Sequence, residues 1–82
     1  MKILKFWAPW CAPCKKQGEL LQEFTTVPVE SINIEEAKNQ DLVIKYDVRN
    51  LPTLILVDGD KEVKRFVGLI SAEKLKEEVI NV

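Results

Sequence analysis

Four short apolar runs along the chain have the length and composition of β-strands. Residues 2–8 show little polar alternation, as expected of a strand that is covered on both faces. Residues 29–34 alternate between apolar and polar types, and residues 54–57 are almost continuously apolar, which favours a central strand. Residues 61–67 follow the turn sequence Asp58-Gly59-Asp60 and are predicted to return antiparallel as a hairpin partner.

A helix is predicted after the first apolar run, over residues 12–25. Its apolar stripe includes Leu20, Leu21 and Phe24, which gives the helix one face for the core. Pro13 stands in the first turn, where its missing N–H costs least.

A shorter helix is expected between the second and third runs. Glu35 and Glu36 suit its first turn, because acidic residues are favourable at the positive end of a helix dipole. Its core stripe consists of Leu42, Val43 and Tyr46.

The last helix is expected to begin after Ser71, a good N-cap, and to run to about Ile80. The order of elements is then βαβαββα. A helical crossover makes the first two strands parallel, and a tight turn makes the last two antiparallel. The sequence therefore predicts an α/β fold, with a four-stranded mixed sheet and helices on both faces.

Composition and charge narrow the class of protein. The chain has 82 residues, 46% hydrophobic and 30% charged, which is ordinary for a soluble globular protein, and we expect one domain over residues 1–82. The net charge of −1 gives no reason to expect nucleic-acid or membrane partners. No stretch approaches the roughly 18 apolar residues of a membrane span, and the N-terminal apolar run is broken by Lys5 and too short for a signal peptide. We expect a soluble, cytoplasmic protein.

The only two cysteines lie in Trp10-Cys11-Ala12-Pro13-Cys14, at the start of the first predicted helix. A helix N-terminus favours a thiolate over a thiol, so the first sulfur is expected to be nucleophilic. The second lies one turn on, close enough to close a disulfide or to resolve a mixed one. Two cysteines are too few for a disulfide-stapled scaffold, and no histidine is present. The pair is interpreted as a redox or metal device in a reducing compartment.

Several segments resemble thioredoxins. Residues 6–15, Phe-Trp-Ala-Pro-Trp-Cys-Ala-Pro-Cys-Lys, are similar to that family's active-site segment, usually Trp-Cys-Gly-Pro-Cys-Lys. Residues 45–54 resemble the stretch that leads to the family's cis-proline, Asn33-Ile34-Glu35 the end of its central strand, and Val67-Gly68-Leu69 the segment with its groove glycine. The resemblance covers almost the whole chain and lacks only the family's extra N-terminal strand and helix. It implies a minimal thioredoxin-like fold.

The resemblance also implies a role for each matching residue. Cys11 would be the exposed nucleophile and Cys14 the buried resolving thiol. Pro52 would be cis, which would leave the backbone of Leu51 free to pair with an extended substrate peptide. The residues implied to bind substrate are Trp10, Ala12, Pro13, Leu51, Pro52 and Gly68.

The implied function is a thiol–disulfide oxidoreductase that reduces protein disulfides through a reversible Cys11–Cys14 dithiol. The resemblance implies no cofactor beyond this pair and no metal. The expected partners are disulfide-containing proteins and either a flavoprotein reductase or glutathione as electron donor. The protein is expected to be a monomer.

The main departure from the family is Lys5. It stands where thioredoxins place a buried Asp, thought to accept the proton of the resolving thiol, and Ser31 stands where they place a nearby lysine. If the Lys5 ammonium approaches the cysteines, it favours their thiolate forms by charge attraction and makes the pair more oxidising. If it reaches solvent instead, the effect is small.

Three alternatives remain open at this point. A glutaredoxin-like, glutathione-dependent enzyme fits the short chain, but Leu51-Pro52-Thr53 differs from the Thr-Val-Pro of glutaredoxins and no Gly-Gly-Asp follows near Gly68. A zinc site would need ligands beyond the one cysteine pair. A non-catalytic binding module is the third.

Overall fold

The computed structural model describes residues 1–82 and contains a four-stranded sheet with the strand order β2-β1-β3-β4. Strand β1 pairs parallel with β2 and antiparallel with β3, and β3 pairs antiparallel with β4. The strands are β1 (Lys2–Trp7), β2 (Val29–Asn33), β3 (Thr53–Asp58) and β4 (Lys61–Val67). The helices are α1 (Ala12–Leu20), the 3₁₀ turn η1 (Ala37–Asn39), α2 (Gln40–Lys45) and α3 (Ala72–Ile80).

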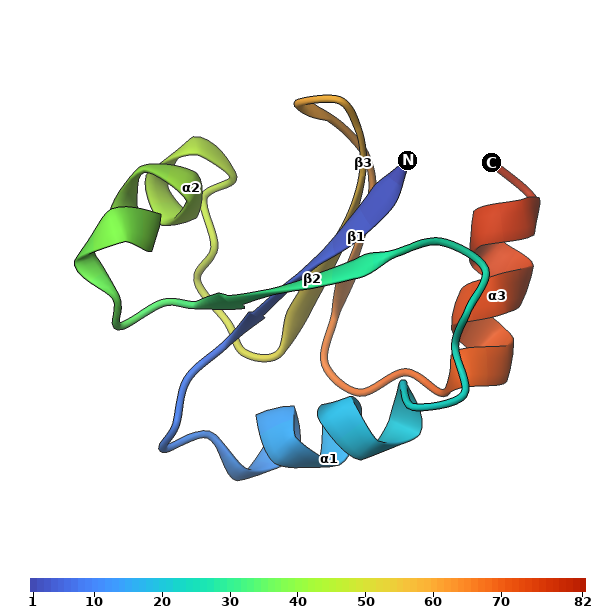
Figure 1. The fold of residues 1–82 in the computed structure, drawn as a ribbon, viewed down its shortest axis with the longest axis horizontal. Helices are drawn as coiled ribbons and strands as arrows, with labels where there is room; N and C mark the ends of the chain where they lie inside the picture. The colour runs from blue at the N-terminus through green and yellow to red at the C-terminus, as the bar shows by residue number, and fades with distance from the viewer.

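The sheet lies between helices on its two faces, so the predicted architecture is confirmed. In Figure 1 the strands run between α2 on the left and α3 on the right, with α1 below. Successive residues of a strand point to opposite faces, which explains how one sheet serves two cores. In β1, for example, Ile3 packs on the side of α1 and α3, whereas Leu4 packs on the side of α2.

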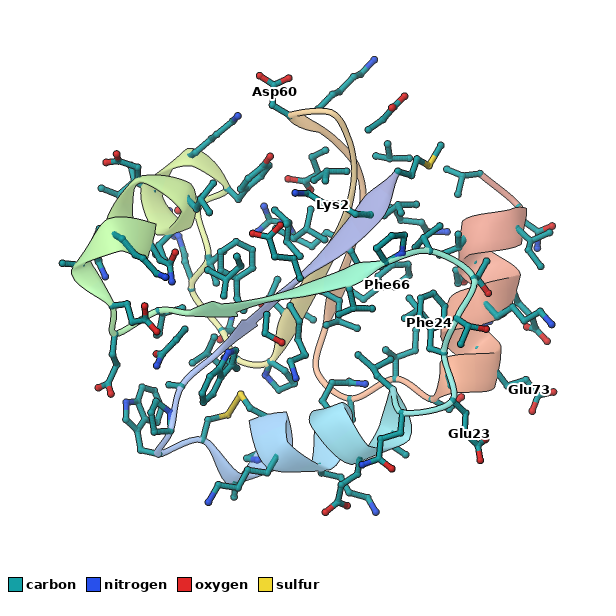
Figure 2. All side chains as sticks on the ribbon, viewed as in Figure 1. Lys2, Glu23, Phe24, Asp60, Phe66 and Glu73 are labelled. Carbon is teal, nitrogen blue, oxygen red and sulfur yellow. A yellow bond between two sulfur atoms is a disulfide. The ribbon has the colours of Figure 1, made fainter.

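The two cores divide the apolar residues of the strands between them. The first core contains Ile3, Leu21, Phe24, Leu54, Leu56 and Leu75. The second contains Leu4, Phe6, Ile32, Tyr46, Ile55 and Val57. Figure 2 shows Phe24 and Phe66 on the side of the sheet that faces α3. The first five residues of β3 are all buried, which confirms that the near-continuous apolar run is a central strand.

Two helix boundaries differ from the sequence prediction. Helix α1 ends at Leu20 rather than residue 25, although Leu21 and Phe24 are buried as predicted. The backbone N–H of Phe24 donates to Leu21 O, so a turn continues the apolar face after the helix has ended.

The prediction that Glu35 and Glu36 occupy the first turn of a helix is wrong. Asn33 Oδ1 accepts a hydrogen bond of 2.9 Å from the backbone N–H of Glu35, a local bond that favours a turn over a helix. Glu36 is therefore only the residue before the 3₁₀ turn, and Asp41 is the acid in the first turn of α2.

Candidate functional site

The two cysteines lie at the N-terminus of α1, where Figure 2 shows the disulfide between them. Cys11 is the N-cap of the helix, and its Sγ accepts a hydrogen bond of 3.2 Å from the backbone N–H of Cys14. Ala8 O accepts from the N–H of Cys11 at 3.1 Å, which fixes the turn between β1 and α1. This arrangement aims backbone N–H groups and the positive end of a helix dipole at the Cys11 sulfur, which favours a thiolate once the disulfide is reduced.

Both cysteines are buried in the disulfide form, so the expectation that Cys11 is exposed is wrong for this state. Cys11 is 6% exposed and Cys14 is 3% exposed. The physical reason is their apolar surroundings, because they form a small cluster with Ala8, against which Trp7 and Leu51 pack. The difference between the two sulfurs lies in access: Cys11 lines a surface pocket and Cys14 does not.

That pocket, which we call the groove, has a volume of about 580 Å³. Its lining residues are Trp10, Cys11, Ala12, Pro13, Ile34, Val48, Arg49, Asn50 and Leu51. Four of the residues predicted to bind substrate therefore meet around Cys11. No role was predicted from the sequence for Val48, Arg49 or Asn50, although all three lie in the stretch that resembles the one before the family's cis-proline.

Pro52 and Gly68 lie beside the groove rather than in its lining. The Leu51–Pro52 peptide bond is cis, which confirms the geometry that the resemblance implied. Pro52 itself is buried, and its carbonyl accepts a hydrogen bond of 3.0 Å from the N–H of Gly68. Gly68 has a φ of 90°, a conformation that favours glycine.

Trp10 is held by a partner that was not predicted from the sequence. Its indole Nε1 donates to Glu35 Oε2 at 2.9 Å, while the residue stays 66% exposed. Glu35 is itself placed by the Asn33 turn described above. In the sequence, Glu35 is visible as an acidic residue just after the end of a strand. The sequence separation between Glu35 and Trp10 gave no reason to pair them.

Lys5 points from β1 towards the underside of α1. It is partly buried, and its register neighbours in the sheet are Ser31 and Leu54, neither of which is charged. A Cβ atom at Gly18 would lie only 3.3 Å from Lys5 Nζ, so the ammonium occupies the space that a side chain at this helix position would take. Gly18 is one turn after Cys14, so the ammonium lies against the helix that carries the cysteine pair.

The shifted pKa values lie outside the groove. A hydrogen bond from Arg65 lowers the pKa of Glu62, and Glu62 raises the pKa of Arg65. A hydrogen bond from Lys64 lowers the pKa of Glu78. The structure contains no group of three or more His, Cys, Asp or Glu side chains that could hold a metal ion, and no helix that is long and apolar enough to cross a membrane.

The fold and the site together define a class of protein. A mixed four-stranded sheet, a disulfide at the N-terminus of the first helix and an adjacent cis-proline are the features of a thioredoxin-fold thiol–disulfide oxidoreductase. The model of the Thioredoxin family matches residues 1–81. The chain therefore belongs to the thioredoxin family.

Individual relatives agree with this placement. The chain is 32% identical to a thioredoxin of Alicyclobacillus acidocaldarius over 98% of its own length and 79% of that protein. It is 35% identical to the thioredoxin of Bacillus subtilis, over 92% of the chain and 75% of the relative. A solved mutant thioredoxin of Halobacterium salinarum superposes with a TM-score of 0.84 at 32% identity, covering 98% of this chain and 72% of the other.

Proposed function

We propose that Cys11 is the nucleophile and Cys14 the resolving thiol in the reduction of protein disulfides. The observation that carries this assignment is that Cys11 lines the groove at the helix N-terminus, whereas Cys14 lies behind it. A substrate sulfur in the groove therefore reaches Cys11 first. The redox centre is the cysteine pair itself.

In the forward reaction the Cys11 thiolate attacks one sulfur of the substrate disulfide. A mixed disulfide forms, and the other substrate sulfur leaves as a thiolate that takes up a proton. The Cys14 thiolate then attacks Cys11 Sγ, so the Cys11–Cys14 disulfide closes and the second substrate thiol is released. Two electrons and two protons pass to the substrate, and an external dithiol, or two molecules of a monothiol such as glutathione, must reduce the pair again.

The groove supplies a place for an extended peptide. The backbone N–H and C=O of Leu51 make no hydrogen bond within the protein, so they are free to pair with a substrate strand. Trp10, Ala12 and Pro13 provide apolar contact on the cysteine side. Pro52 and Gly68 support the Leu51 side through their mutual hydrogen bond.

The electron donor is proposed to be a flavoprotein reductase of the kind that serves thioredoxins, acting on a monomer in the cytoplasm. Family membership supports a reductase partner in general. Glutathione is the alternative donor. Turnover of NADPH with a thioredoxin reductase, compared with glutathione and glutathione reductase, separates the two.

The assignment of the cysteines is tested by insulin reduction with dithiothreitol. We expect Cys11→Ser to lose catalysis entirely, and Cys14→Ser to accumulate a mixed disulfide with insulin that mass spectrometry detects. Cys11→Ser reducing insulin at the rate of the parent protein would disprove the proposal.

We further propose that Lys5 tunes the redox potential. Its ammonium lies against Gly18 of α1, one turn from Cys14, and has no charged register neighbour in the sheet, which supports a role in stabilising the thiolates of the reduced state. Lys5→Met is expected to make the pair more reducing by roughly 10–30 mV in a glutathione equilibrium. The exposed Lys15→Met is the control, and equal potentials for both variants would argue against a role for Lys5.

A further inference from the structure

Gln17 is a buried polar side chain in the middle of the active-site helix. It is 0% exposed and, with Thr53, is one of two polar residues in the buried interior. It lies on α1, close to one turn after Cys14. A buried amide is costly unless its donors and acceptors find partners, so its position calls for a specific role.

The partner of Gln17 is a single residue far along the chain. Gln17 Nε2 donates to Ile70 O at 2.8 Å, and Gln17 Oε1 accepts from the N–H of Ile70 at 2.9 Å. The two residues are 53 positions apart. This pair of bonds, which we call the Gln17 clamp, fixes the backbone of the β4–α3 connection against α1, the two segments that approach each other at the bottom of Figure 1.

The clamped connection is also bonded to the residue next to the groove lining. The N–H of Gly68 donates to the carbonyl oxygen of Pro52. Pro52 directly follows Leu51, which lines the groove. On either side of Gly68, Val67 is 58% and Leu69 is 53% exposed. The connection is thus tied to the cysteine helix through Ile70 and to Pro52 through Gly68, and it exposes an apolar side chain on either side of Gly68.

We propose that Gln17 is a positioning residue that holds Val67-Gly68-Leu69 as a wall against which protein disulfides dock. The inference rests on the proposed function of Cys11 and adds a determinant of substrate class to it. An apolar residue at position 17 would fill the same space beside the first core, so packing alone does not explain the amide. What the amide adds is a two-point bond that fixes both the distance and the orientation of the wall.

The proposal distinguishes large from small substrates. A small disulfide needs only access to Cys11 Sγ, whereas a protein disulfide also needs the wall to contact the chain around its cysteine. Loosening the wall should therefore slow reaction with insulin and leave reaction with dipyridyl disulfide unchanged, since misplacing a docking surface by about 1 Å lowers rates by up to about 100-fold.

The test compares the fully reduced Gln17→Met variant with the parent in single-turnover reactions. Methionine matches glutamine in size and removes both bonds. We expect the second-order rate constant with insulin to fall about tenfold and the constant with dipyridyl disulfide to stay within about twofold. Gln22→Met, an exposed glutamine just after the same helix, is the matched control and should resemble the parent in both reactions.

Two further outcomes keep the inference separate from the function on which it rests. Gln17→Glu keeps an oxygen that accepts from the N–H of Ile70 and loses the donor. Its rate constant with insulin should therefore lie between those of Gln17→Met and the parent. Gln17→Glu takes the place of Gln17→Met in the test if Gln17→Met does not fold. Equal losses with both disulfides, or no loss with insulin, would overturn the role of Gln17. A parent protein no faster than Cys11→Ser with dipyridyl disulfide would instead overturn the proposed function itself.

Discussion

Two side chains join distant parts of this protein to backbone atoms, and each supports a different side of the groove. The Gln17 clamp holds the connection that contains Gly68, through uncharged bonds to Ile70. On the other side, the guanidinium of Arg65 on β4 donates to the carbonyls of Tyr46 and Asp47, at the end of α2. We call this second arrangement the Arg65 clamp. It steadies the start of the loop that contributes Val48, Arg49 and Asn50 to the groove.

The two clamps differ in burial and charge. Gln17 is fully buried, whereas the Arg65 side chain is 30% exposed and is itself paired with Glu62 at 2.9 Å. A neutral buried bond is costly to break because its partners are left without water, while an ion pair at the surface is screened and weak. The comparison therefore predicts that acid and salt leave the stability contributed by the Gln17 clamp unchanged. The stability contributed by the Arg65 clamp should depend on both.

The largest effect is expected from removing the neutral clamp. Gln17→Met leaves the N–H and C=O of Ile70 without their partner, which should lower the free energy of unfolding by about 2 kcal/mol. For a domain of this size that corresponds to a fall in Tm of roughly 8–16 °C. Thermal and urea unfolding of the oxidised protein measure it, and a loss no larger than that of Gln22→Met would remove the distinction between the clamps.

A smaller effect is expected from removing the charged clamp. Arg65→Met leaves the carbonyls of Tyr46 and Asp47 without the guanidinium, but the bond to Asp47 is exposed and the bond to Tyr46 only partly buried, so water replaces part of the bonding. We expect the free energy of unfolding to fall by about 1 kcal/mol. Arg49→Met is the control, since that exposed arginine pairs with Asp47 through its side chain only. A loss for Arg65→Met that exceeds that for Gln17→Met would reverse the comparison.

Neither clamp was predictable from the sequence, although the fold was. The central place of β3 and its pairing with β4 followed from patterns that act over a few residues: the unbroken apolar run of β3 and the Asp58-Gly59-Asp60 turn. The Gln17 clamp depends instead on a backbone group 53 residues away, and glutamine on a helix ordinarily indicates an exposed position. The hydrogen bond between Trp10 and Glu35 was not predicted for the same reason, because only the folded chain brings the two residues together.

The boundaries that the sequence misplaced also have a local cause. Leu21 and Phe24 are buried as the apolar stripe predicted, but burial does not require a helix, and the chain leaves α1 at Leu20. At Glu35 the side chain of Asn33 competed with helix formation. The cysteine pair and the cis-proline were found from the sequence because their residue types carry the chemistry themselves, whereas Gln17 acquires its role from its partner.

The smallest and most specific effect concerns acid. The hydrogen bond from Arg65 holds the pKa of Glu62 below its ordinary value near 4.5, so Glu62 binds fewer protons in the folded state than in the unfolded state. Its contribution to stability is then fully present above pH 4.5 and is lost as the pH falls through the lowered value. Lys64 lowers the pKa of Glu78 in the same way, so acid removes stability there too. That loss is common to every variant discussed.

Stability curves against pH should therefore separate the two clamps by shape as well as by size. Arg65→Met should flatten the decline of the free energy of unfolding below pH 4.5. Without Arg65 the pKa of Glu62 is no longer lowered, so its protonation no longer costs stability. Gln17→Met should lower the whole curve by a constant amount, because no charge is involved. Added salt should reduce the difference between parent and Arg65→Met and leave the Gln17→Met difference intact. If instead Gln17→Met steepened the acid limb, the Gly68 side of the groove would depend on charge after all.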